Sequence, residues 1–124
     1  MTAGPRVDLA AALAEAGGPT LTCLSEMPAQ APALPALVVR PGAPYRTESL
    51  VPYCREHWGL EIVALVPIDA VLPLDDLDAL ITLCRDVIRG IPTAAYNGVR
   101  EAPAQQSIGG QSMRGAIVQL ELDT

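Results

Sequence analysis

The chain has 124 residues, and its eight arginines and fourteen acidic residues, with no lysine, give a formal net charge of −6. This length is typical of a single domain covering residues 1–124, and folding should bury somewhat more than ~60% of the unfolded surface. The acidic balance argues against general affinity for nucleic acid, because binding to phosphates requires a basic patch.

Apolar runs and cysteines limit the class of protein further. No run approaches the ~18–20 apolar residues of a membrane-spanning helix, and the N-terminus lacks a basic region followed by an apolar one. We therefore expect a soluble protein that does not use the signal-peptide route and does not bind membranes. Cys23, Cys54 and Cys84 form an odd, scattered set that is not typical of a disulfide framework. Free thiols in a reducing compartment are the expectation.

The first third of the chain predicts a short helix, a short strand and a loop. Residues 6–16 lie between a proline and a Gly-Gly pair, and Leu9 and Leu13 are the only large apolar anchors of the predicted helix. Thr20–Ser25 alternates as a short strand. Met27–Pro35 holds three prolines, which favour extended chain over helix or central strand.

The next segment predicts a strand followed by a long loop. Ala36–Arg40 is a β-branched run bounded by prolines. We interpret Pro41–Glu56 as the loop, and long loops in compact domains are usually functional or mobile. A solvated loop without function is the alternative interpretation. The loop contains four residues of types enriched at the energetic centres of interfaces, namely Tyr45, Arg46, Tyr53 and Arg55.

The clearest pattern lies between residues 57 and 89. From His57 to Val66 apolar residues occupy both faces of a strand, which Pro67 ends. From Leu74 to Arg89 apolar residues recur at spacings of three and four, as in an amphipathic helix. Aspartates at its start and arginines near its end match the helix dipole. We expect this strand to be central in a sheet and this helix to cover it.

The last third predicts one further strand. Thr93–Ala104 is interpreted as irregular, with Asn97-Gly98 as a tight turn. Gly109-Gly110 is interpreted as a hairpin connection, and Ala116–Asp123 alternates as a strand with one apolar and one more polar face. The order of elements favours an α+β domain with a mostly antiparallel sheet and two helices packed against one face.

Several residues suggest parts of a catalytic or metal site. Cys54 and His57 have a spacing found in metal sites, but zinc requires three or four ligands and the sequence supplies no second pair. The same pair could act as a thiol nucleophile and its base, yet no orienting motif accompanies it.

Asp75, Asp76 and Asp78 are explained by the helix dipole. Gly109-Gly110 lacks a phosphate-loop pattern, and Cys84 lies on the apolar stripe as a buried thiol. We expect no catalytic, metal or cofactor-binding residues, and an interaction or structural protein.

Four stretches together carry a resemblance to a known family: "ALVVRPGAPY", then "REHWGLEIVALVP", "PLDDLDALITLCRDVIRGIP" and the closing "RGAIVQLELDT". They are similar to the tail-terminator proteins of long-tailed (siphovirus) bacteriophages. In that family a strand with the pattern W-x-L-x-V-x-x-x-V-P precedes a helix rich in LDxLxxL. The resemblance covers roughly residues 5–124.

The resemblance implies a structural virion protein that is assembled in the host cytoplasm. It implies a homo-oligomeric ring, a hexamer, at the head-proximal end of the tail tube, where the protein stops tube growth and joins the tail to head-completion (stopper) proteins. DNA would only pass through the lumen. The nearest alternative is another phage neck protein, such as a head–tail stopper or connector. A small enzyme that uses Cys54 and His57 is the third reading.

A ring also makes demands on the interface. We expect Tyr45, Arg46, Tyr53 and Arg55 to lie at contacts with neighbouring copies or with the tail tube. Six copies would carry a formal −36 (6 × −6), so salt bridges from the few arginines should help to hold the ring. The free protein is therefore expected to be monomeric or weakly associated and to form its ring on the tube end.

Overall fold

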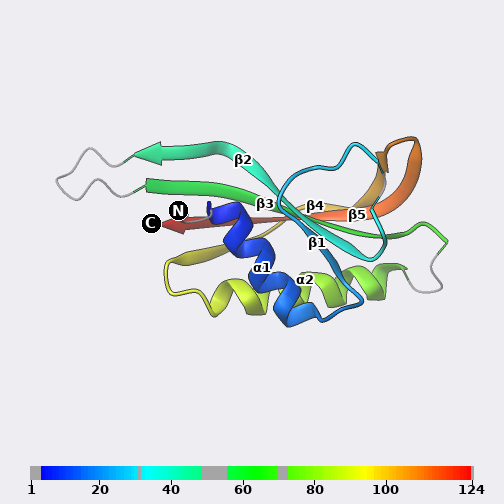
Figure 1. The fold of residues 1–124 in the computed structure, drawn as a ribbon, viewed down its shortest axis with the longest axis horizontal. Coiled ribbons are helices and arrows are strands. Elements are labelled where there is room, and N and C mark those ends of the chain that lie inside the picture. The colour runs from blue at the N-terminus through cyan, green and yellow to red at the C-terminus, as the bar shows by residue number, and fades with distance from the viewer. Residues whose placement is uncertain (1–3, 31, 49–55, 70–72, 124) are drawn as a thin grey trace.

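The computed structural model describes residues 4–30, 32–48, 56–69 and 73–123. Within these residues, five strands form one sheet in the order β1-β2-β3-β5-β4 (Figure 1). β1 pairs with β2 in parallel, and all other neighbours are antiparallel. The predicted α+β class with a mostly antiparallel sheet is therefore confirmed. The elements in chain order are α1 (Pro5–Gly17), β1 (Thr22–Leu24), β2 (Ala36–Glu48), β3 (Glu56–Pro67), α2 (Pro73–Arg89), β4 (Ala94–Ile108) and β5 (Gln111–Asp123).

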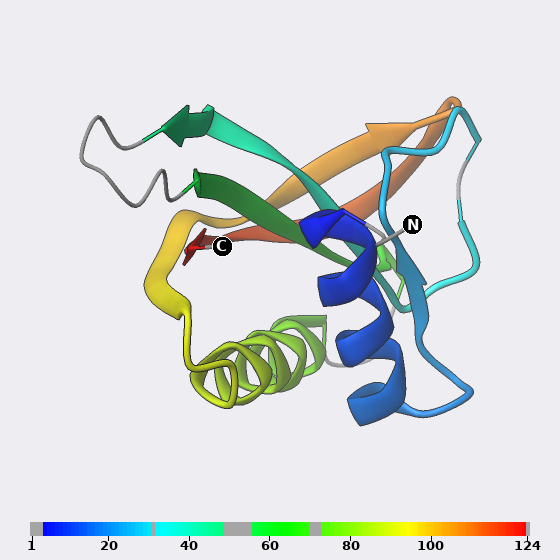
Figure 2. The ribbon, with the colours of Figure 1, turned by 60° about the vertical axis from the view of Figure 1, so that its left-hand side comes forward.

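Both helices pack against the same face of the sheet, as predicted (Figure 2). Strand alternation places the even-numbered residues of β3 and β5 on this face. Leu9 and Leu13 of α1 are buried there, as the sequence predicts. The main core between helices and sheet consists of Leu9, Ala10, Leu13, Leu37, Val39, Leu60, Ile62, Ala64, Val66, Leu77, Leu80, Cys84, Ile88, Ala116, Val118, Leu120 and Leu122.

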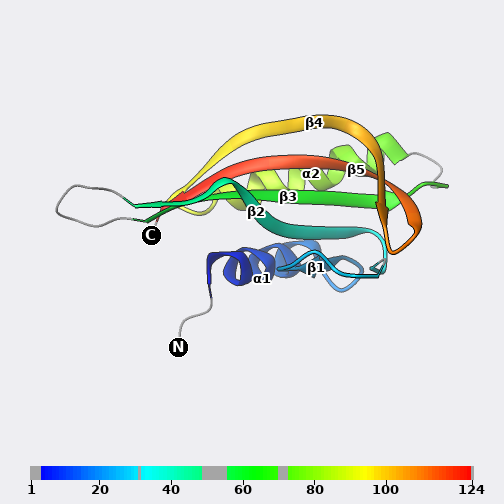
Figure 3. The ribbon, with the colours of Figure 1, turned by 90° about the horizontal axis from the view of Figure 1, so that it is seen from above.

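β3 is the central strand, as predicted, with β2 on one side and β5 on the other (Figure 3). Every residue from Leu60 to Val66 is buried. α2 covers this strand through a stripe that begins at Leu77 and continues through Cys84 to Ile88. Leu74, in the first turn of α2, is 54% exposed, so the buried stripe is one turn shorter than the sequence pattern suggests.

The opposite face of the sheet carries a second, smaller core at one end. The second core takes Leu34 from the connection between β1 and β2, and residues from both sides of the β4–β5 hairpin. Figure 1 places that connection and that hairpin at the same end of the sheet. Toward the other end this face carries polar side chains instead. The second core consists of Ala36, Val38, Val63, Leu65, Ile108, Met113 and Ile117, with Leu24 and Leu34 packed against it.

The prediction that Thr93–Ala104 is irregular is wrong, because most of this segment belongs to β4. Its register against β5 shifts three times, which removes the alternation that marks a strand. Asn97-Gly98 is not a tight turn; Gly98 has φ +93° and lies at one of these shifts. Gly109-Gly110 does connect the two strands, and both glycines have positive φ, which a two-residue hairpin turn with two left-handed positions requires.

Candidate functional site

The prediction of a loop over Pro41–Glu56 is wrong for Pro41–Glu48, which continues β2 along β3. Pairing with a central strand overrides the local effect of the prolines, because the ladder satisfies backbone groups that a loop would leave to water. Tyr45 and Arg46 thus belong to a strand, and Arg46 pairs in register with Trp58. Tyr53 and Arg55 lie outside the described residues.

A wide bulge in β2 accommodates the prolines. Pro41 pairs with Leu60 and Arg46 pairs with Trp58, so the four residues 42–45 lie opposite the single residue Gly59. The chain passes very close to β3 here, because a Cβ at Gly42 would lie 2.9 Å from the backbone carbonyl of Gly59. Glycine at position 42 is therefore needed for this path.

A polar hollow of about 450 Å³ lies beside the bulge, on the sheet face away from the helices. Gly59 of β3 lines this hollow, and Glu121 is its direct neighbour on β5. The polar groups that line the hollow come from β3, β4 and β5, which strand pairing holds side by side. Its lining includes Gly42, His57, Gly59, Glu61, Asn97, Gln119 and Glu121.

Glu61 is a charged residue in the middle of an otherwise aliphatic strand, and it is 4% exposed. Arg40 is its direct cross-strand neighbour, and the Arg40 Nε–H donates to Glu61 Oε1 at 2.9 Å. A buried carboxylate needs such a charged donor, because an uncompensated charge away from water costs several kcal/mol. The pair fixes the register of β2 on β3 immediately before the bulge.

The cysteines of the described residues do not form a reactive centre. Cys84 is buried in the main core, as predicted, and burial raises the pKa of its thiol to about 12. Burial also raises the pKa of Cys23. A thiol with a raised pKa carries little thiolate at neutral pH and is a poor nucleophile. Cys54 lies outside the described residues, and His57 is an exposed residue near the start of β3, so their pairing is not tested.

The acids at the start of α2 agree with the helix-dipole interpretation. Asp75 and Asp76 lie in the first turn of α2 and are exposed. Among the described residues, no group of three or more His, Cys, Asp or Glu side chains is placed to hold a metal ion.

An apolar groove lies at the end of the sheet where β3 finishes and α2 begins. Val66, Pro67 and Leu80 line it, and its volume is about 390 Å³. Ile68 and Leu74, near the groove in sequence, are among the exposed large apolar residues of the chain.

The sequence did not predict most of the polar hollow, because its residues come from four strands, β2, β3, β4 and β5, that are separated in sequence. One signal was available: Gly59 and Glu61 interrupt the apolar residues of β3 on one face only. An interruption confined to one face indicates that this face has a different environment.

Comparison with known proteins gives no independent assignment, since no protein-family model and no curated protein matches the chain. Within the described part of the chain, no helix is both long and apolar enough to cross a bilayer. Function is therefore inferred from the surface geometry and from the resemblance that β3 and α2 carry.

Proposed function

We propose that this chain is a tail-terminator subunit of a long-tailed bacteriophage. In this role it forms a ring, with six copies as the resemblance implies, at the head-proximal end of the tail tube. There it stops tube growth and connects the tail to head-completion proteins. The observation that carries the proposal is that the stretches bearing the resemblance coincide with the central strand β3 and the helix α2 that covers it. β3 and α2 build the main core, so a resemblance in these elements supports a similarity of the whole domain rather than of a single loop.

The charge of the chain supports a conduit for DNA. Each copy carries a formal −6, and a duplex is retained only by proteins that neutralise its phosphates with basic groups. A ring of such subunits would let DNA pass through its lumen without holding it. Fold alone does not determine function. The agreement between the acidic charge of the subunit and the passage of DNA therefore supports the proposal independently of the fold.

The β2–β3 hairpin supplies the proposed contacts with neighbouring copies or with the tube. Tyr45 is the last residue of the bulge in β2 and Arg46 resumes the pairing with β3, and Tyr53 and Arg55 complete the set that we assign to the interface. Tyrosine and arginine contribute more binding energy than most residue types when an interface desolvates them. We propose that the free protein associates weakly and that the tube end supports ring formation by binding several copies at once.

An amber mutation in this gene, in the phage that carries it, tests the proposal. Loss of a terminator should give tails of uncontrolled length, measured by negative-stain electron microscopy of lysates. Loss of a head–tail stopper or connector should instead give tails of normal length that stay separate from filled heads. Tails of normal length would therefore reject the terminator assignment and favour the neighbouring neck role. The position of the gene is a further check, because a terminator gene should lie just before the tail-tube gene.

Complementation with variants tests the interface. Arg46→Glu combined with Arg55→Glu should leave the subunit folded but give tails of uncontrolled length. Cys54→Ala combined with His57→Ala should restore tails of normal length, since no thiol chemistry is proposed. Failure of the Cys54 and His57 variant to complement, with the protein folded and abundant, would favour the enzyme alternative.

A further inference from the structure

Arg114 differs from the other arginines whose side chains the structure describes. It is exposed on β5, and no partner for its guanidinium occurs within the described residues. In a chain with a formal charge of −6, a cation without an internal partner is available for an acidic group elsewhere. The other four have partners in their own chain: Arg6 has Ser25 and Glu26, Arg40 has Glu61, Arg85 has Asp86 and Arg89 has Tyr96.

Glu121 provides a carboxylate that could pair with the guanidinium of Arg114. Its direct neighbours in the sheet are Gly59 on β3 and Ala95 on β4, and neither has a side chain that could pair with a charge. Opposite charges normally stabilise such direct cross-strand positions. Glu121 is exposed, and it has no ion-pair partner among the described residues.

The polar hollow around Glu121 has a suitable chemistry for a guanidinium group. Gly42 and Gly59 add no side-chain volume, which leaves room for a planar group in a space of about 450 Å³. A guanidinium presents five N–H donors in a fork and requires several acceptors in fixed positions. The carboxylate of Glu121 and the side-chain oxygens of Gln119 and Asn97 supply them around the same hollow.

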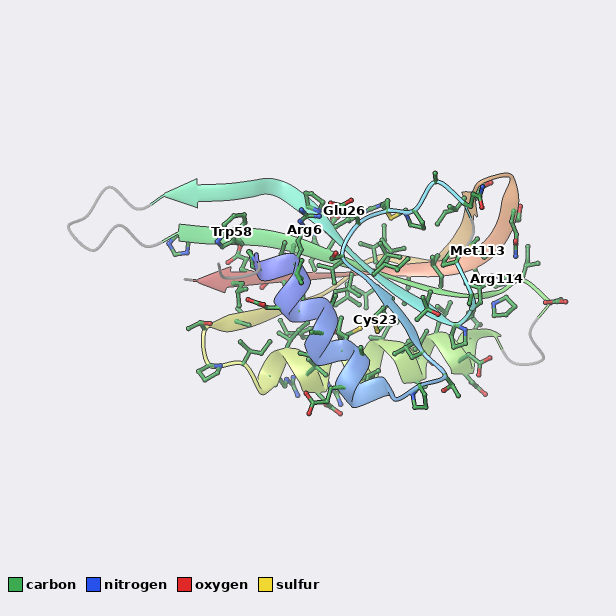
Figure 4. The ribbon with its side chains drawn as sticks, in the orientation of Figure 1. Arg6, Cys23, Glu26, Trp58, Met113 and Arg114 are labelled. Carbon is green, nitrogen blue, oxygen red and sulfur yellow. The ribbon has the colours of Figure 1, made fainter. Side chains whose placement is uncertain are left out.

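Arg114 and Glu121 cannot meet within one chain. They lie seven residues apart on β5, which corresponds to about 23 Å along a strand. Successive residues of a strand point to opposite faces of the sheet. Arg114, like the other even-numbered residues of β5, is therefore on the face that the helices cover, and Glu121 is on the other face. Figure 4 places Arg114 toward one end of the sheet and Trp58, the neighbour of Gly59, toward the other end.

We propose that Arg114 of one copy inserts into the polar hollow of the next copy and pairs with its Glu121. A contact between two different surfaces at opposite ends of a subunit is heterologous, and repeated contacts of this kind close into a ring when the rotation allows. The pairing rests on the proposed ring function and adds one specific contact between neighbouring copies to the contacts proposed for the β2–β3 hairpin. It also accounts for a polar hollow at one end and, at the other, an arginine without a partner in the described part of the chain.

The proposal predicts association that depends on charge and on salt. Screening weakens partly exposed charge pairs, so self-association of the purified protein should decrease as ionic strength rises. Each charge reversal, Arg114→Glu or Glu121→Arg, should weaken association by about tenfold or more, because it replaces attraction with repulsion. Both residues are exposed, so neither change should disturb folding, and far-UV circular dichroism checks this.

Sedimentation velocity over a concentration series at low salt provides the test. Arg114→Glu and Glu121→Arg should each lose association, and the double variant should regain it. A one-to-one mixture of the two single variants should also associate, because each interface then joins opposite charges. Arg85→Glu is the matched control, since it changes the net charge equally at an arginine outside the proposed contact, and it should retain association.

Three results would overturn the pairing: a wild-type protein that stays monomeric at every concentration, a control as defective as Arg114→Glu, or a double variant that does not recover. The ring contact and the terminator function can fail separately. Charge-dependent association together with an amber mutant that makes tails of normal length would keep the contact and reject the terminator function. Normal tails from the Arg114→Glu variant, alongside uncontrolled tails from the amber mutant, would reject the contact alone.

Discussion

The difference between Leu77 and Leu74 provides the sharpest test of how α2 holds the domain together. Both belong to the same predicted apolar stripe, but Leu77 is 0% exposed whereas Leu74 is 54% exposed. Truncation of a fully buried leucine to alanine costs about 3 kcal/mol, from lost transfer free energy and from the cavity that remains. Truncation of the exposed leucine should change stability by less than about 0.5 kcal/mol. Alanine is the better helix former by a similar small amount at both positions, so the difference between the variants measures burial.

Urea unfolding, followed by Trp58 fluorescence and by far-UV circular dichroism, measures this difference. Leu77→Ala should lower the midpoint without changing the slope of the transition, and it should lower Tm by about 10 °C in a domain of this size. Leu74→Ala should superimpose on the wild type. Equal destabilisation by the two substitutions would show that α2 does not pack through the face that begins at Leu77.

Three further substitutions test other features of the fold. Arg40→Leu should destabilise the protein by about 3–5 kcal/mol because it removes one partner of a buried ion pair, while Arg40→Leu with Glu61→Leu should recover most of the loss in urea unfolding. Burial raises the pKa of Cys84 from 9.0 to about 12, so the folded state keeps this proton at pH values where the unfolded state releases it. Stability measured against pH should therefore fall from about pH 9 upward, and less in Cys84→Ala. Gly42→Val should destabilise by about 1–3 kcal/mol, because its Cβ would lie 2.9 Å from the backbone of β3, whereas Gly4→Ala, in open space, should have little effect in thermal unfolding.

The central strand and the second helix were predictable because their signals are local. Within Leu74–Arg89, and on the face of His57–Val66 that carries Trp58, Leu60 and Ile62, the apolar spacing repeats regularly, and each period matches one type of element. The packing of both helices on one face followed from the order of the elements. These features require no knowledge of which distant segment a strand pairs with.

β4 and the second half of β2 were not predictable in the same way. Each is held in place by a neighbouring strand, and each contains residues that local rules assign to loops, such as Pro41 and Pro103. Bulges accommodate these residues within the strands. A bulge also shifts the register, so the alternation of apolar and polar residues that marks a strand is lost. The second core was missed for a related reason, since Leu34 in an irregular connection covers part of it. The polar hollow likewise requires the pairing of Gly59 with Glu121, which no local pattern reveals.

The same irregularities restrict how copies of this chain can associate. β1 pairs only with Ala36–Val38, and the later part of β2 contains Pro41 and Pro44 and the wide bulge. At the other edge β4 contains Pro103 and three register shifts. Prolines and bulges on edge strands prevent the addition of a strand from another chain, because they remove donors and twist the edge. Neighbouring copies should therefore meet through side chains rather than through a continuous sheet, which is the kind of contact that a charged pair at opposite ends of the subunit provides.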